Sequence, residues 1–258
     1  MATSAPANQF KDSTDSFFRT IALSMAATIV AGFSMQFLAG RSTFAARPLV
    51  HVHGIAFMLW VGIFTTQVWL ATRGPIALHR KLGWFAAGWI VVLVALGFLI
   101  TIDVTQRGTA PFFFRPQFFL IANPLSALVF AALAWMAIRL RRQTDWHMRL
   151  QICAMAAILG PGFGRLLPMP LLIPYSFEAA GIAGLVFPIA GAVRDWRREG
   201  KVHPAWWWGV VAILAVIPVA HALAASPVGD ALYAAVTAGY PGAAVSGMEF
   251  PPPPPMPG

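Results

Sequence analysis

Four histidines in this 258-residue sequence are placed so that they could bind a metal. His79 and His147 each lie just before an apolar run, beside basic residues, whereas His53 and His221 lie near the ends of two other apolar runs. Two histidines at one depth on facing helices can hold one haem iron, if their second ring nitrogens also have partners. The pattern predicts two ligand pairs, His79 with His147 and His53 with His221. Solvated histidines in basic loops would give the same residues at the first pair.

A second kind of chemistry concerns charge inside the apolar runs. Arg165 cannot lose its proton to escape burial, so it needs a carboxylate, a phosphate or a haem propionate as partner. Glu178 is the nearest acidic residue in the sequence and is expected at the same end of the molecule. The two residues therefore form either a structural ion pair or part of a cofactor or ligand site.

His53 also begins a regular stripe of polar and aromatic residues. His53, Trp60 and Gln67 are seven residues apart each time, and at about 100° per residue they fall close to one line of a helix. Such a stripe faces protein or a cofactor rather than lipid, or it forms a packed aromatic seam. His51 points about 200° away from His53 in a regular helix, so the two rings do not chelate one ion.

The composition requires membrane helices to position these side chains. Hydrophobic residues make up 58% of the chain and charged residues 10%, with a mean hydropathy of +0.69, whereas a soluble domain carries about 25% charged residues. The net charge of +9 is gathered in short clusters between apolar runs, which is typical of membrane topology and not of nucleic-acid binding. We therefore expect a multi-pass protein of the bacterial inner membrane, surrounded by the lipid bilayer.

Seven runs of about 20 mostly apolar residues are each long enough for one crossing, and they lie near residues 19–39, 49–71, 83–102, 117–138, 150–172, 175–193 and 205–225. With this alternation, thirteen basic residues fall on one side and four on the other, which places the N-terminus in the cytoplasm and the C-terminus outside. The predicted fold is an all-α polytopic bundle of seven transmembrane helices. It comprises a cytoplasmic N-terminal segment (1–18), the bundle (19–225) and a Pro/Gly-rich external tail (226–258).

Three local features add to this outline. The Gly-Pro-Gly at 160–162 interrupts the fifth run, and Pro161 predicts a kink, used either for packing alone or for lining a binding site. The tryptophans at 206–208 begin the last run and are expected to anchor it at the membrane interface. The tail ends in PPPPPMPG, which favours polyproline II structure. It is either disordered or docked on a partner in a larger membrane complex.

Two short motifs give the chain a resemblance. LHRKLGW at 78–84, with WHMRL at 146–150 and the later Arg165, resembles a group of bacterial polytopic membrane proteins without an assigned function. That group carries His-Arg-x-x-Gly at one span and a histidine and arginines at another, and here the second motif is shortened to His147-Met148-Arg149. The group is distantly similar to b-type cytochromes with four-helix, bis-histidine cores, and the match covers about residues 49–168. The resemblance implies haem b as a cofactor.

Three functions are consistent with these residues. The first is an electron-transfer protein that binds haem b, with histidines in two layers and Arg165 available for propionates. The second is a transporter or small-molecule-binding protein whose outward polar pocket contains His53, Arg165 and Glu178. The third is an accessory subunit whose tail contacts a partner. A retinal protein is excluded because residues 205–225 contain no lysine. The sequence contains neither an HxxxH zinc motif nor a GxxxxGK phosphate-binding loop, so neither kind of enzyme is indicated.

Overall fold

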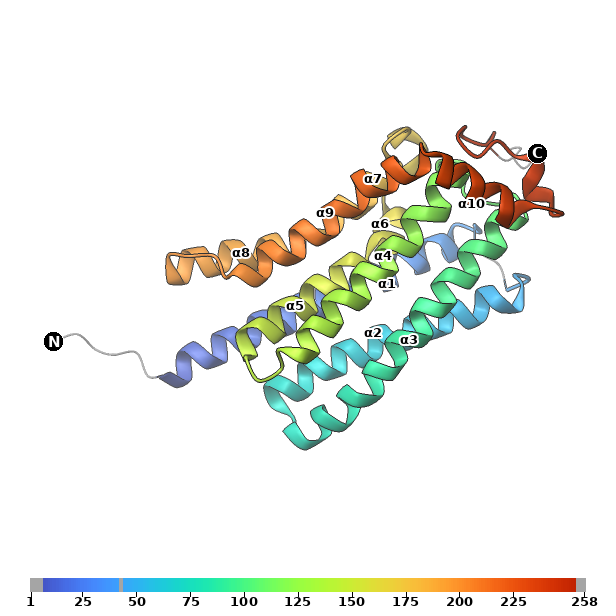
Figure 1. Ribbon diagram of the computed structural model, residues 1–258. Coiled ribbons are helices and arrows are strands. Elements are labelled where there is room, and N and C mark those ends of the chain that lie inside the picture. The colour runs from blue at the N-terminus through green and yellow to red at the C-terminus, as the bar shows by residue number, and fades with distance from the viewer. Residues whose placement is uncertain (1–6, 42–43, 254–258) are drawn as a thin grey trace.

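The computed structural model describes residues 7–41 and 44–253, and the regular structure in these ranges is helical throughout. Uninterrupted long helices are α1 (Ala7–Leu38), α2 (Pro48–Arg73), α3 (Ile76–Gln106), α4 (Pro116–Arg139) and α9 (Pro204–Ala224). Two paths are broken, α5 (Thr144–Ala157) followed by α6 (Gly160–Leu166), and α7 (Ser176–Gly184) followed by α8 (Val186–Glu199). Shorter elements are η1 (Met169–Leu172), α10 (Pro227–Thr237) and η2 (Pro241–Ala244). They form an elongated bundle with α10 at one end (Figure 1).

Six helical segments of the described chain are long and apolar enough to cross a membrane. They are Thr14–Leu38, Pro48–Arg73, Ile76–Gln106, Pro116–Arg139, Ser176–Glu199 and Pro204–Ala224. The predicted all-α membrane fold is thereby confirmed, and each of the six segments coincides with a predicted run. The predicted run at 150–172 is not among the six, because its helix ends at Ala157 and begins again at Gly160.

Pro161 accounts for the break between α5 and α6. Its ring nitrogen carries no hydrogen to donate to the carbonyl four residues earlier, at Ala157. The turn before it tightens, because the Ile158 and Leu159 amides donate to carbonyls three residues back. The kink that the sequence predicts is present, and beyond it α6 packs against α1 and α7.

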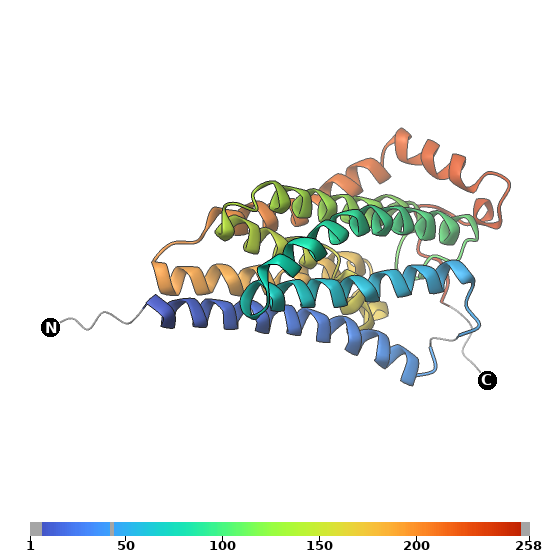
Figure 2. The ribbon, with the colours of Figure 1, turned by 90° about the horizontal axis from the view of Figure 1, so that it is seen from below.

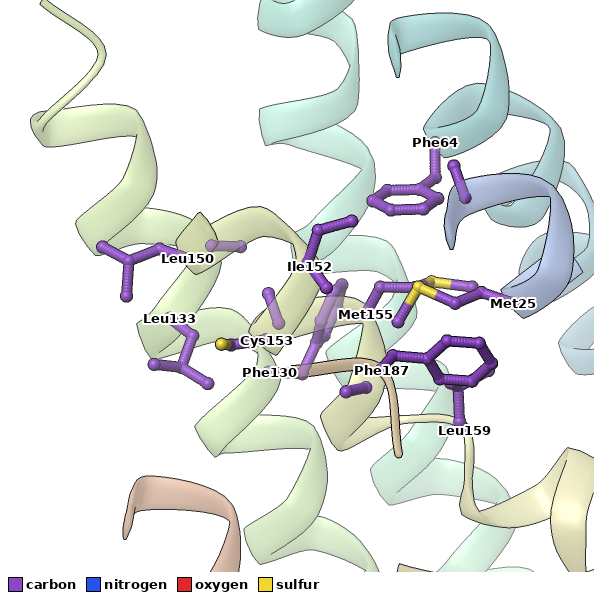
Figure 3. Close-up of a cluster of buried hydrophobic side chains, with 14 of the residues drawn as sticks. Met25, Phe64, Phe130, Leu133, Leu150, Ile152, Cys153, Met155, Leu159 and Phe187 are labelled. Carbon is purple, nitrogen blue, oxygen red and sulfur yellow. The ribbon is translucent and has the colours of Figure 1, made fainter. Parts of the chain in front are cut away.

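Helix α4 lies at the centre of the packing. It contacts α3, α5 and α9, whereas α2 contacts α1 and α3. Figure 2 shows α1 and α2 side by side along the bundle. The main hydrophobic core brings together α1, α2, α4 and the α5–α6 path, and its buried members include Met25, Phe64, Phe130, Met155 and Leu159 (Figure 3). The core therefore joins helices from both halves of the sequence through apolar side chains.

Two glycines permit the closest helix contacts. Gly32 of α1 lies against α6, where an added Cβ would overlap the Gly162 carbonyl. Gly191 of α8 lies beneath the Trp206 indole, which occupies the space that a side chain would need. These contacts hold α6 on α1 and α9 on α8.

A buried ionic network joins α5, α8 and α9 at the basic end of the bundle, which we define as the end where α2, α4 and α8 finish in arginine-containing turns. Arg149 and Asp195 are 4% and 2% exposed, and Arg149 donates from Nε and Nη2 to the Asp195 carboxylate at 2.8 and 3.1 Å. The Trp206 indole nitrogen donates to the same carboxylate at 2.7 Å. Trp206 is therefore a buried donor and not the interfacial anchor predicted, whereas Trp207 and Trp208 are exposed.

The C-terminal segment folds back on the opposite end of the bundle. Gln117, at the start of α4, donates its backbone amide to the Gly247 carbonyl at 2.9 Å. Its side-chain amide donates to the Ala224 carbonyl and to the Asp230 carboxylate, both at 2.7 Å. The segment that the sequence marks as a Pro/Gly-rich tail thus contains α10 and η2 and packs on α3, α4 and α9. The end of its proline run, from residue 254, lies outside the described residues.

Removing the Asp195 charge is expected to destabilise the bundle. Asp195→Asn leaves the buried Arg149 guanidinium with only the exposed Asp145 carboxylate, at 3.3 Å, as an anionic partner. Breaking a buried pair costs about 3–5 kcal/mol. The unfolding midpoint of the purified protein in detergent, followed by circular dichroism, measures the loss. Arg139→Gln, at an exposed position of the same end, is the matched control and should change stability by less than about 0.5 kcal/mol. Equal midpoints for the two variants would show that the network does not stabilise the fold.

Candidate bis-histidine site

His79 and His147 come together at the basic end of the bundle. Each is the fourth residue of its helix, in α3 and α5 respectively, and both side chains are half-buried. Their ring centroids are 6.3 Å apart and their ring planes are perpendicular, at 89°. The predicted pairing of these two histidines is therefore present, although they lie far apart in the sequence.

The backbone fixes which nitrogen of each ring is free. The Nδ1 atom of His79 lies 3.2 Å from the Gln67 carbonyl oxygen, and that of His147 lies 2.9 Å from the Ala137 carbonyl oxygen. Because a carbonyl oxygen only accepts hydrogen bonds, both Nδ1 atoms must carry the proton. In the neutral rings the lone pair then lies on Nε2, the state of a metal-binding histidine whose second nitrogen is held by a backbone carbonyl.

The spacing of the two rings fits a single metal between them. A metal–nitrogen bond of about 2 Å and a ring radius of about 1.2 Å place an imidazole centroid about 3.2 Å from the metal. Two rings on opposite sides of one ion then have centroids about 6.4 Å apart, close to the 6.3 Å between His79 and His147. The pair therefore has the tautomers of metal-binding histidines and a centroid separation close to that of two imidazoles on one ion.

Zinc sites and haem iron differ in the number of protein ligands that they require. Among the described residues, no group of three or more His, Cys, Asp or Glu side chains is arranged to hold a metal ion. A structural or catalytic zinc site takes three or four protein ligands. A haem iron needs only the two axial ones, because the porphyrin supplies the others. The two histidines therefore lack the further protein ligands that a zinc site requires.

Burial keeps the His147 ring neutral. The His147 side chain is half-buried, and desolvation disfavours the charged form of an imidazole. The start of a helix carries a partial positive charge, which also disfavours a histidinium there. The Nε2 lone pair is therefore available at neutral pH.

At the opposite end of the bundle, Glu178 pairs with His221 and not with Arg165. Glu178 is buried in α7 and lies 2.6 Å from His221 Nε2 in α9, and the His221 ring also packs on Phe118 at 4.4 Å. Arg165 forms no salt bridge with Glu178 or with any other described acid. The ion pair between Arg165 and Glu178 that the sequence suggests is therefore not formed.

His53 and His221 do not face each other either. His53 stacks on Phe57 at 4.5 Å and interacts with the Leu96 backbone in α3, whereas α9 packs on α4, α5 and α8. No ring contact between His53 and His221 occurs in the described chain. The structure thus brings together the inner of the two predicted ligand pairs and separates the outer one.

The stripe on α2 is where polar atoms lack partners. Buried side-chain atoms without a hydrogen bond, among the described residues, are His53 Nδ1, Trp60 Nε1, Gln67 Oε1 and Asp103 Oδ2. The last of these lies 2.9 Å from the Arg107 guanidinium and so belongs to an ion pair. The other three are the residues that the seven-residue spacing places on one line.

Sequence reasoning missed the residues that anchor the histidine site. Asp195 lies in the run RDWRRE, where it looks like one charge in a solvated basic loop, yet it is buried against Arg149. A single acid among arginines at a helix end was the available signal. A cleft of about 270 Å³ lies between α1 and α2 beside Arg19 and Trp69, and the described residues that line it include none of the predicted ligands.

Comparison of the chain with protein-family models, with curated proteins and with solved structures finds no match. A helical membrane bundle supports many functions, and fold alone does not select one of them. Function must therefore be argued from the side chains of the site.

Proposed function

We propose that this protein is a membrane electron-transfer protein that binds haem b between His79 and His147. The observation that carries the proposal is the pair of matching tautomers, with each Nδ1 held by a backbone carbonyl and the ring centroids 6.3 Å apart. When bound, haem supplies a one-electron iron couple whose potential depends on its axial ligands and their hydrogen bonds. The resemblance of the two histidine motifs to bis-histidine cytochromes agrees with this proposal.

The chain's own residues have separate tasks in this site. The Gln67 and Ala137 carbonyls fix the rotation of the two imidazoles, which keeps both Nε2 atoms available. Arg141, whose charge acts on His147, is available for a propionate carboxylate. The Arg149–Asp195 pair holds α5 at the depth that His147 requires. Because His53 and His221 are apart, the proposal contains one haem and not two layers.

The membrane arrangement that goes with this function is a seven-crossing bundle in the bacterial inner membrane. The α5–α6 path from Thr144 to Leu166 covers 23 residues, and at about 1.5 Å per residue it can span about 30 Å of hydrocarbon despite its break. Counting it as a crossing leaves the basic residues concentrated on the side of His79 and His147. The positive-inside rule then makes that side cytoplasmic.

Loss of either ligand should abolish haem binding. The purified full-length protein is expected to show a b-type band in its reduced-minus-oxidised visible spectrum. His79→Ala and His147→Ala should each lower the bound haem at least about tenfold, since each removes an axial ligand. His51→Ala, at the start of α2, should leave haem content and spectrum unchanged.

Circular dichroism of the same samples separates ligand loss from unfolding. A folded wild-type protein that contains no iron and shows no b-type band, even after expression with added haem, would refute the haem site. A normal spectrum in both folded histidine variants would also refute it.

Seven crossings predict that the two ends of the bundle sequence lie on opposite sides of the membrane. In a Cys153→Ala background, Ala225→Cys should react with an impermeant maleimide added to whole cells. Ser16→Cys and the control Glu199→Cys should react only after the membrane is opened. Labelling of Ser16→Cys and Ala225→Cys from the same side would instead require an even number of crossings.

A further inference from the structure

Arg165 holds a full positive charge at a depth where charge is costly. Its guanidinium cannot be deprotonated in a protein, and its side chain is half-buried near the end of α6. The side chain makes two described contacts. One Nη1 hydrogen is donated to the Pro161 carbonyl at 2.8 Å, and the guanidinium lies over the Phe33 ring of α1 at 3.9 Å. Neither contact supplies a negative charge.

The acids at this end of the bundle are engaged elsewhere. Glu178 binds His221 at 2.6 Å, and Asp103 binds Arg47 at 2.7 Å and Arg107 at 2.9 Å. Among the described residues, Arg165 therefore has no carboxylate partner. An unpaired charge in a low-dielectric site is strongly destabilising, so its retention calls for an anion from outside the chain.

The position of Arg165 is set without an ion pair. Gly32 lets α1 and α6 touch, because an added Cβ there would overlap the Gly162 carbonyl and crowd the Cβ of Arg165. The Gln36 side-chain amide donates to the Arg165 carbonyl at 3.0 Å. The guanidinium is thus held in place by backbone packing and an aromatic ring, with most of its five N–H donors unused.

His53 supplies a second polar group. His53 lies in the first two turns of α2, at the same end of the bundle as Arg165, and its Nδ1 atom is buried without a hydrogen-bond partner. Two turns deeper on the same line, the Trp60 indole nitrogen is also unpartnered, in a side chain that is only 4% exposed. The fold therefore leaves two buried nitrogens on one face of α2 without partners, and it leaves the Arg165 guanidinium of α6 without an anion.

We propose that Arg165 and His53 form a binding site for an oxyanion, a carboxylate or phosphate group that enters from the end of the bundle opposite the bis-histidine site. The Phe33 ring covers the face of the guanidinium, so its edge is left for the two parallel hydrogen bonds with which arginine recognises such groups. The anion is either a soluble carboxylate or phosphate, or the phosphodiester of a membrane lipid. This site is separate from the haem proposal and does not depend on it.

The test uses the full-length protein in maltoside detergent after removal of lipid. Its thermal unfolding is followed while acetate, inorganic phosphate or short-chain phosphatidylglycerol is titrated against chloride at equal ionic strength. At least one oxyanion should raise the midpoint of the wild type and of the control Arg41→Gln, an exposed arginine at the same end. The apparent affinity should fall about tenfold or more in Arg165→Gln, which loses the charge and the bidentate fork.

Comparing the three titrations identifies the source of the anion, and comparing the variants tests the proposed site. A response to acetate or phosphate without lipid assigns a soluble ligand, and a response to phosphatidylglycerol alone assigns the lipid. Arg165→Lys, which keeps the charge but not the fork, should bind more weakly than the wild type, and His53→Phe should weaken binding without changing the haem spectrum. The proposal is overturned if no oxyanion stabilises the wild type relative to chloride. It is equally overturned if Arg165→Gln responds as the wild type does.

Discussion

The buried ion pair between Arg149 and Asp195 fixes the basic end of the bundle. It joins α5 to α8, and the Trp206 indole, seated on Gly191, adds α9 to the same carboxylate. Because neither charge can be left unpaired in this interior, the three helices have one permitted arrangement there. His147 lies two residues before Arg149 on α5, so the depth and rotation that the ion pair imposes on this helix also place the His147 ring beside His79.

The helix break before Pro161 allows α5 and α6 to run in different directions through the bundle. α5 follows α4 and carries His147, whereas α6 turns onto α1 and carries Arg165. A continuous helix would link the rotation of the two side chains at about 100° per residue. With the helix interrupted, the histidine site and the arginine site can each take the orientation that their own neighbours require. Gly162, the residue after Pro161, lies against Ile29 and so permits tight packing of α6 on α1.

The sequence was sufficient for features that depend on one helix at a time. Apolar run lengths located the six confirmed spans, Pro161 located the break, and the seven-residue spacing on α2 identified an interior line. Features that depend on which helices are neighbours were less accessible, because helix order does not determine packing. The argument from equal depth paired His79 with His147, which lie close together, and His53 with His221, which lie on helices that pack elsewhere. Asp195 was missed because a buried acid and a solvated one look alike in a basic run.

The polar residues of the bundle fall into two groups, those whose buried polar atoms have hydrogen-bond partners within the protein and those with a buried atom that has none. Asn123 donates to the Thr101 hydroxyl at 2.7 Å, and Asp195 has two donors, so these residues need nothing beyond the protein. His53, Trp60 and Gln67 differ, since each keeps a buried atom without a partner. The line they form runs along α2 from His53 to Gln67, whose backbone carbonyl holds His79. Because unsatisfied buried groups are costly, this face of α2 is where groups from outside the chain should be bound, and it connects the two proposed sites.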